Sequence, residues 1–382
     1  MTFQNSLKLT GTRIFFKGSF LFALLILSPH AFGYLENSSH GYANCMSCHV
    51  SPNGGGLLTD YGRSLSKELM STWGWEGSQA PLFGAIKQTN NFKVGGDIRT
   101  LQTHFENDQL RQGKFFLMQQ NLELAYKYAS TWFVGTVGTN EGPDGTLNRG
   151  TFLSERHFII HKVGENSYLR AGKFRVSYGL NDPNHARVTE QGIGFGSQTE
   201  MYNLELDQFF DEGELFVGAS LGRFDLPREQ TSEKSFYTRY NHYFKGKNQL
   251  GGNLLVGESP TKRRSLLGVF AVLTPIDDLG VVTEWDYERA HLSTSPSDRV
   301  EGIFTASRVL YEVYQGVKPY VVFEAQQPSL KDHGTQSLRP GLGVQWIPIP
   351  HFEIQGEYQR ITTDATGGSP THSAWLMLHF WL

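Results

Sequence analysis

The C-terminal stretch Thr371-His-Ser-Ala-Trp-Leu-Met-Leu-His-Phe-Trp-Leu382 decides the fold of this chain. Successive residues of an extended strand point to opposite faces, so every second side chain lies on the same side. One of these faces is apolar throughout and consists of Ala374, Leu376, Leu378, Phe380 and Leu382. Because this face ends flush with the last residue, the final strand can pair with the first strand and close the sheet.

The same alternation recurs upstream of this strand, from about residue 91, with turn residues between the segments. We count about sixteen such segments, an even number as single-chain bacterial barrels require. In the clearest segments, apolar and aromatic residues share one face and charged or amide residues the other. Their apolar faces are Leu122, Leu124, Tyr126 and Tyr128; Gly172, Phe174, Val176 and Tyr178; Tyr202, Leu204 and Leu206; Val281, Thr283, Trp285 and Tyr287; and Phe352, Ile354, Gly356 and Tyr358.

The composition favours a membrane barrel over a soluble sandwich. Gly makes up 42 of 382 residues and aromatic residues 13 %, while charged residues reach only 19 %, below the ~25 % of soluble globular chains. A soluble β-sandwich also alternates, but its inward faces are apolar and its outward faces polar. A barrel with its polar faces turned inward and its aromatic faces turned to lipid fits this sequence better than a sandwich does. Residues 91–382 are therefore predicted to form an all-β transmembrane barrel of antiparallel strands in the bacterial outer membrane, with lumen-lining rather than catalytic charges.

Charge and cysteine content exclude two other classes. A formal net charge of −3 gives no sign of a nucleic-acid partner. Two cysteines in the whole chain exclude a disulfide-rich scaffold.

Residues 1–33 resemble a secretory signal peptide. Basic residues precede a short apolar run at 20–27, and Ala31-Phe32-Gly33 offers a small-x-small cleavage site. The run is shorter than the ~20 residues that a helix needs to cross a bilayer, with an uncleaved anchor as the alternative. Export places the remaining chain beyond the inner membrane, where a Cys pair is oxidised or captured by a cofactor.

Cys45-Met46-Ser47-Cys48-His49 has the C-x-x-C-H spacing that is typical of c-type haem attachment. Two thiols three positions apart can add to the two vinyl groups along one porphyrin edge. The adjacent imidazole of His49 then lies under the iron as its axial ligand. The sequence therefore predicts one covalent haem c, held by Cys45, Cys48 and His49.

Three other interpretations of the same motif were weighed. A redox dithiol would be followed by a βαβ pattern, which this chain lacks here. A zinc site would need a second Cys or His pair at ligand spacing, and none follows in this segment. A plain structural disulfide would leave His49 unexplained.

The segment 34–90 is too short to enclose a haem by itself and is expected to act as a plug inside or at the mouth of the barrel. A flexible loop, Ser51-Pro52-Asn53-Gly54-Gly55-Gly56, is followed by a short helix with an apolar face of Leu58, Tyr61, Leu65 and Leu69. The second iron ligand stays open: Met70 could reach back, although a packing role is favoured, and His40 or a more distant His are alternatives. Arg63 could pair with a haem propionate, but a solvated surface charge is the default.

The layout resembles the fused monohaem cytochrome–porins of bacterial outer membranes, some of which act as extracellular Fe(II) oxidases. Residue-level similarity is confined to Cys45–His49 and to Pro52, Leu58 and Tyr61-Gly62-Arg63. The resemblance implies that Cys45 and Cys48 hold the haem and that His49 ligates the iron. The Gly54-Gly55-Gly56 run departs from the pattern of the iron oxidases, which leaves the electron donor open.

Two functions of different class follow. The first is electron transfer through a haem in a porin-like barrel, between periplasmic c-type cytochromes and an extracellular partner such as Fe(II). The second is a passive porin whose N-terminal segment is only a structural plug.

Overall fold

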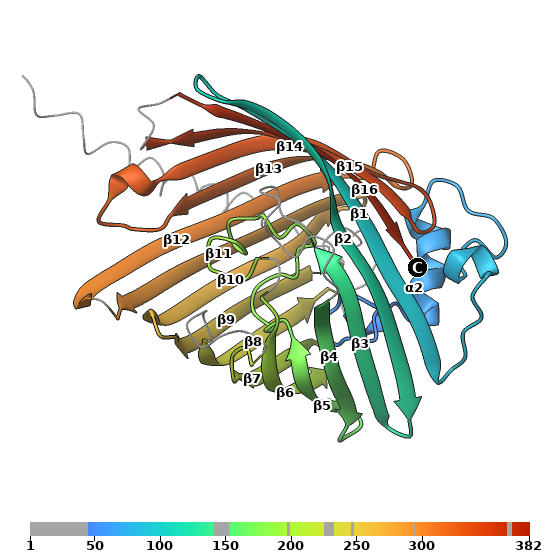
Figure 1. Cartoon of the computed structure of the whole chain (residues 1–382). Coiled ribbons are helices and arrows are strands. Elements are labelled where there is room, and N and C mark those ends of the chain that lie inside the picture. Colours follow the sequence, from blue (N-terminus) through green and yellow to red (C-terminus); the bar gives the residue numbers. More distant parts are fainter. Residues whose placement is uncertain are drawn as a thin grey trace, which may run out of the picture.

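The computed structural model describes residues 45–140, 153–196, 199–224, 233–245, 248–293, 295–364 and 369–382. These residues form one closed barrel of sixteen strands, in which every strand pairs antiparallel with its neighbours in sequence (Figure 1). The predicted fold class is confirmed. The predicted signal peptide and His40 lie outside the described residues.

The strands are long enough to cross a membrane when tilted. Their bounds are β1 (Phe92–Glu106), β2 (Arg111–Tyr128), β3 (Thr131–Asn140), β4 (Leu153–Lys162), β5 (Ser167–Phe174), β6 (Met201–Phe210), β7 (Gly213–Ser220), β8 (Lys234–Phe244), β9 (Asn248–Glu258), β10 (Lys262–Ile276), β11 (Leu279–Leu292), β12 (Ser295–Tyr311), β13 (Val317–Gln327), β14 (Ser337–Ile349), β15 (Phe352–Thr363) and β16 (Thr371–Trp381). The helical turns are η2 (Cys45–Ser47), α2 (Asp60–Leu65), η3 (Ser66–Met70), η4 (Pro81–Gly84) and η5 (His333–Thr335). No helix in the described part of the chain is long and apolar enough to span a bilayer.

The last strand closes the barrel as its sequence predicts. Strand β16 lies between β15 and β1, with Phe380 opposite Ile98 in the β1 ladder. The amide of Leu382 donates to the carbonyl of Gly96 at 2.8 Å, so the pairing continues to the last residue. Closure leaves no free sheet edge, which a barrel in lipid requires.

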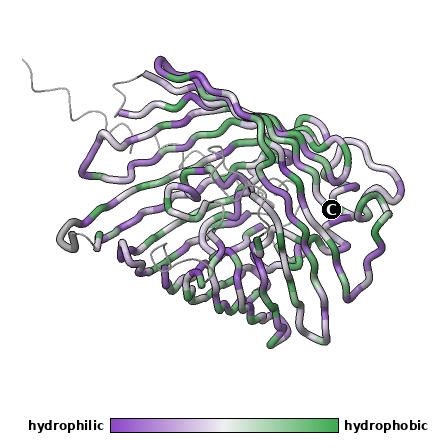
Figure 2. Tube along the Cα trace, viewed as in Figure 1, coloured by the Kyte–Doolittle hydropathy of each residue, from purple (hydrophilic) through white to green (hydrophobic). Residues whose placement is uncertain are grey.

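The outer wall is apolar and the inner wall polar, as the alternation predicts; along the strands, hydrophobic and hydrophilic residues alternate in Figure 2. On β2 the side chains of Leu122, Leu124 and Tyr126 are exposed on the outside, whereas Asn121 and Glu123 are buried inside. Facing assignments on β6, β11, β15 and β16 follow the same order, except that Val281, on the predicted outer face of β11, is buried.

One predicted face is wrong. Strand β5 ends at Phe174, and Phe174 points inward, where it packs with Phe158 and Ile160. Val176 and Tyr178 are also buried, but in the connection that follows β5. Alternation alone could not distinguish an aromatic face turned to lipid from one that packs on other segments inside the barrel.

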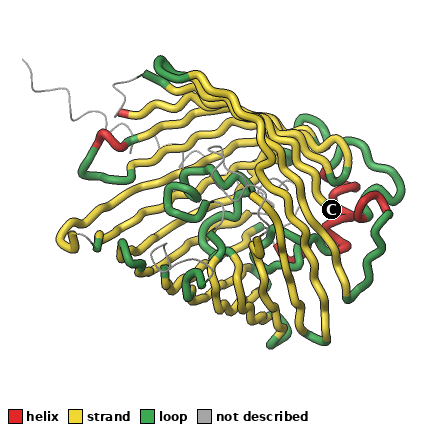
Figure 3. The backbone as a smooth tube through the Cα atoms, in the orientation of Figure 1, coloured by secondary structure: helices red, strands yellow, loops and turns green. Residues whose placement is uncertain are grey.

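This connection, the inward loop (residues 175–196), runs inside the barrel, where Figure 3 shows irregular chain in the middle of the strands. Its Val176, Tyr178, Ile193 and Phe195 form an apolar cluster with inward side chains of the wall. Buried ion pairs add to this packing, among them those that link Arg187 to Glu324 at 2.6 Å and to Glu357 at 2.8 Å. Part of the lumen is therefore a packed core.

The two ends of the barrel differ in their connections. At one end the turns are as short as 129–130, 211–212 and 277–278, and at the other end the connections include the inward loop. Short turns face the periplasm in outer-membrane barrels. The α2 helix and the C-terminus lie together at this end (Figure 1), where Gln315 of the β12–β13 turn donates to the carbonyl of Ser71.

Candidate functional site

The predicted haem motif lies inside the barrel, in a stretch that we call the motif loop (residues 45–58). Val50 and Leu57 face each other across the loop, with the Val50 amide donating to the Leu57 carbonyl at 2.9 Å. Both side chains pack against Phe158 and Phe174 of the inner wall. The segment thus enters the lumen from the periplasmic end and takes its shelter from the strands.

Polar contacts from three parts of the barrel hold the tip of the motif loop. Arg170 of β5 donates to the Ser51 hydroxyl at 3.0 Å, and Arg239 of β8 donates to the Asn53 side chain at 2.5 Å. The side-chain amide of Asn181, from the inward loop, donates from Nδ2 to the Asn53 backbone carbonyl at 3.1 Å. These residues were not foreseen individually, because the sequence places them on the inner face without showing what they meet there.

Three consecutive glycines shape the tip. Gly54, Gly55 and Gly56 all have left-handed backbone conformations, with φ between 65° and 75°. A side chain at Gly54 would approach the sulfur of Cys45 at 3.2 Å, and one at Gly56 would approach a carboxylate oxygen of Glu123 at 3.0 Å. The glycine run thus has the backbone conformations and close approaches that only glycine readily allows, where it passes between the motif and the wall.

The motif has the local geometry of a single helical turn. The amides of Cys48 and His49 both donate to the carbonyl of Cys45, at 3.2 and 2.9 Å. The two thiols are not joined in a disulfide, and both cysteines and His49 are half-buried. Two free thiols and an imidazole are therefore presented together inside the lumen.

The ring of His49 has a defined orientation. Its Nδ1 lies 3.3 Å from the carbonyl oxygen of Gly56, which can only accept a hydrogen bond. Nδ1 therefore carries the proton in the neutral ring, and Nε2 carries the lone pair. Ligating histidines characteristically donate the other ring N–H to a carbonyl or carboxylate in this way.

Burial inside the barrel controls the charge of all three groups. Desolvation lowers the pKa of His49 to about 4, and nearby Arg156 acts in the same direction. Desolvation also raises the pKa of Cys45 to about 12, with Glu214 adding to the rise, and that of Cys48 to about 11. At neutral pH the imidazole is neutral and the thiols stay protonated, so a reactive dithiol is disfavoured.

A charged pair stands beside the motif. Arg156 of β4 donates to Glu123 of β2 at 2.6 Å, and Glu123 also accepts from Thr136. Arg156 lies close enough to His49 to lower its pKa. The wall next to the imidazole is therefore polar and compensated in charge.

Arg63 differs from the default expectation of a solvated surface charge. Its side chain is only 3 % exposed, and one guanidinium nitrogen donates to the Val94 carbonyl at 2.9 Å. Its Nε and Nη1 are buried without a hydrogen-bond partner among the described residues. Desolvation lowers the pKa of Arg63 to about 10. The helix α2 buries Gly62, Arg63 and Leu65 and exposes Tyr61, so the predicted apolar face is also wrong at that position.

Met70 lies in η3 at the periplasmic end, where its carbonyl is near Gly316 of the β12–β13 turn. The structure does not test whether Met70 ligates a metal, and this stays a prediction.

The residues present fit a c-type haem. Two separate thiols one turn apart, a neutral imidazole with its lone pair on Nε2, and a buried guanidinium with two unpartnered nitrogens suit a porphyrin with anionic propionates. In the described ranges, no group of three or more His, Cys, Asp or Glu side chains is arranged to hold a metal ion.

Comparison with known proteins identifies the fold. No family model and no curated protein matches the chain. Among solved structures, a loop-deletion mutant of OmpT, an outer-membrane protein of Vibrio cholerae, matches with a TM-score of 0.61 and 14 % identity over 76 % of this chain and 99 % of its own. The outer-membrane channel DcaP of Acinetobacter baumannii matches at 0.57 and 12 % over 78 % and 99 %, and an anion-selective porin from Comamonas acidovorans at 0.58 and 9 % over 76 % and 99 %.

The class of protein follows from these matches and from the lipid-facing wall. The fold is that of the porin-like outer-membrane β-barrels, and the chain belongs in the bacterial outer membrane, as predicted.

Proposed function

We propose that this barrel is an electron-transfer protein that carries one covalent c-type haem in its lumen. The single observation that supports the proposal most strongly is the location of Cys45-Met46-Ser47-Cys48-His49 inside a closed barrel. Bound there, a haem would supply one-electron redox chemistry within a wall that otherwise insulates the two sides of the membrane.

Each residue of the site has a separate role in the proposal. Cys45 and Cys48 would hold the porphyrin through thioethers, and His49 would ligate the iron through Nε2. Gly56 orients the imidazole through its carbonyl. Arg63, whose guanidinium is buried, would compensate a propionate. Met70 would be one candidate for a second iron ligand, with a packing role or a His ligand as the alternatives.

The proposed partners lie on the two sides of the membrane. The motif loop continues directly into α2 at the periplasmic end, which favours periplasmic c-type cytochromes as partners on that side. The other partner would be an extracellular donor or acceptor such as Fe(II). The packed inward loop leaves less room for a wide aqueous path, which favours electrons over bulky solutes as the cargo.

The test is the visible spectrum and haem stain of outer-membrane fractions from cells that express the chain with a haem-attachment system. We expect a covalent c-type spectrum in the wild type and its complete loss in Cys45→Ala/Cys48→Ala. Heat-dependent mobility on a gel verifies that the variant barrel is still folded. A folded wild-type protein without a c-type spectrum rules out the proposal.

A passive porin is the second candidate, and the comparisons favour it, because the matching structures are described as channels and porins. In that case the motif loop would only narrow the lumen. Solute flux through reconstituted wild type, unchanged in Cys45→Ala/Cys48→Ala and accompanied by no haem stain, would establish this alternative. Reduction of the purified protein by Fe(II), seen as a change in a haem spectrum, would exclude it as the complete description.

A further inference from the structure

The chain that follows η3 leaves the lumen side of the barrel and reaches its outer surface. We call residues 71–85 the rim segment. The amides of Thr72 and Trp73 donate to the carbonyls of Ile347 and Pro348 at 2.9 and 2.8 Å, near the end of β14. The indole of Trp346 donates to the Thr72 hydroxyl at 3.1 Å, and the rings of Trp73 and Trp346 meet edge to face at 5.9 Å.

Trp346 lies on the outer face of the wall. It alternates with Gln345 and Ile347, which are both buried, and it is opposite Ile354, which belongs to the outward face of β15. The first half of the rim segment therefore packs on the surface of the barrel that faces lipid.

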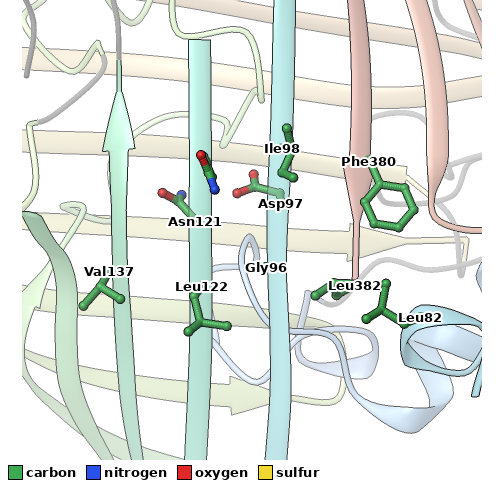
Figure 4. A pocket seen from close by; sticks show the side chains of 10 residues that line it. Leu82, Gly96, Asp97, Ile98, Asn121, Leu122, Val137, Phe380 and Leu382 are labelled. Atoms are coloured by element: carbon green, nitrogen blue, oxygen red, sulfur yellow. The ribbon is translucent and has the colours of Figure 1, made fainter. Parts of the chain in front are cut away.

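The second half reaches the outer surface at the end of β16, next to the seam between β16 and β1. Leu82 of η4 lies beside Phe380 and Leu382 at the end of β16, as Figure 4 shows. Together with Ile98 and Leu122 they border a groove of about 290 Å³. The rim segment thus runs from the end of β14 to the end of β16, one of the two strands that close the barrel.

Four large apolar side chains of this segment are left exposed. Trp73, Trp75, Leu82 and Phe83 are 56, 48, 39 and 42 % exposed, and the rings of Trp75 and Phe83 are stacked at 5.6 Å. Leu82 and Phe83 both have left-handed backbone conformations, with φ of 46° and 54°. Two adjacent strained non-glycine residues are unfavourable, so an interaction outside the described contacts is expected to compensate for them.

We propose that the rim segment is a membrane anchor. Trp73, Trp75, Leu82 and Phe83 insert into the periplasmic leaflet, and a phospholipid acyl chain occupies the groove beside Leu82. The occupant is lipid because the segment joins the apolar outer wall at both of its ends, and because Trp is enriched at the interfaces of membrane proteins. This inference does not depend on haem binding.

The consequence is mechanical. The rim segment follows the motif loop and α2 directly in sequence, so lipid contacts at Trp73 and Leu82 hold the chain that enters the lumen against the periplasmic rim. Leu82 also lies next to the seam at which the first and last strands meet.

Brominated phospholipids test the proposal, because bromine quenches only those Trp residues that contact acyl chains. The fluorescence of Trp75 is obtained as the difference between the full-length wild type and Trp75→Phe in vesicles of plain or brominated phosphatidylcholine. Trp285, on the outward face of β11, serves as the lipid-facing reference through Trp285→Phe. We expect bromination to quench Trp75 to an extent comparable with Trp285.

A second pair of variants separates lipid contact from a general loss of folding. Leu82→Asp should reduce the quenching of Trp75 by bromine, whereas Leu110→Asp, an exposed leucine in the turn between β1 and β2 at the opposite end, should not. If Trp75 is insensitive to brominated lipid but is quenched by aqueous acrylamide, the membrane anchor is refuted. The exposed aromatic side chains would then face water and be available to a water-soluble partner.

Discussion

Two segments enter the lumen of this barrel, and they are held there in different ways. The inward loop contributes Tyr178, Ile193 and Phe195 to an apolar cluster and fixes Arg187 between two buried carboxylates. The motif loop is held by polar contacts at its tip, at Ser51 and Asn53, and by the smaller apolar contribution of Val50 and Leu57, and its cysteines remain half-buried.

The difference separates stability from function. Apolar packing and buried ion pairs make the inward loop part of the barrel core, so its replacement should affect folding. The motif loop offers thiols and an imidazole to the lumen, so its replacement should mainly affect what the lumen can bind. Substitutions in each segment test whether the inward loop serves stability and the motif loop serves binding.

The largest effect is expected for the inward loop. Arg187→Met would leave Glu324 and Glu357 buried without their cation, which costs about 3–5 kcal/mol in comparable sites. Denaturant unfolding in detergent micelles, followed by tryptophan fluorescence, measures the loss.

Two controls belong with this variant. Arg263→Met removes an ion pair with Glu258 in which both side chains are largely exposed, and it should change stability by at most about 1 kcal/mol. Cys45→Ala in the motif loop of the haem-free protein should also have a small effect. Equal losses in Arg187→Met and Arg263→Met would show that the inward loop is not a stabilising core.

The walls of the barrel could be predicted from sequence for a simple physical reason. A strand with lipid on one side and a polar lumen on the other must have alternating apolar and polar side chains. Neighbouring residues such as Leu204, exposed on the outside, and Glu205, buried inside, show this alternation. Closure could be predicted as well, because the apolar face of β16 ends at Leu382. The haem-attachment motif could be recognised from the spacing of Cys45, Cys48 and His49 alone.

The packing inside the lumen could not be predicted, because it depends on contacts between residues far apart in sequence. Phe174 has the alternation of a lipid-facing residue, yet it packs against Val50 of the motif loop. Arg63 has the spacing of a surface charge, yet it is buried beside Val94 of β1. The strained backbone at Leu82 also has no signature in the local sequence.

The next largest effect concerns the outer wall. Leu342 is exposed in the middle of β14. The substitution Leu342→Lys should lower the free energy of unfolding by about 2–4 kcal/mol, because the charge would enter the centre of the bilayer. Phe352 begins β15 beside a periplasmic turn, so Phe352→Lys should cost no more than about 1 kcal/mol. Unfolding of both variants from lipid vesicles compares them, and equal costs would contradict the assigned depths.

A smaller effect is expected at the tip of the motif loop. Gly56→Ala and Gly77→Ala both place a side chain on a left-handed residue, which costs roughly 1–2 kcal/mol each. Only Gly56→Ala also brings a methyl group close to the Glu123 carboxylate, whereas Gly77 has open space around it. We expect the larger loss in Gly56→Ala, together with a changed environment of His49. Identical losses would mean that the loop does not press against the wall.

The effect that is smallest at neutral pH, and grows only on acidification, is a pH dependence that arises in the motif loop. The pKa of His49 is lowered from its ordinary value of 6.5 to about 4 by burial, so the folded state resists protonation. Between pH 6.5 and 4 the unfolded chain binds a proton at this residue and the folded chain does not, and stability therefore falls as the pH falls through this window. Denaturation midpoints of haem-free Cys45→Ser/Cys48→Ser should decrease more steeply on acidification than those of the same protein with His49→Gln. If stability fell with pH to the same extent in both proteins, the imidazole of His49 would be in contact with water. The motif loop would then not be sheltered by the barrel.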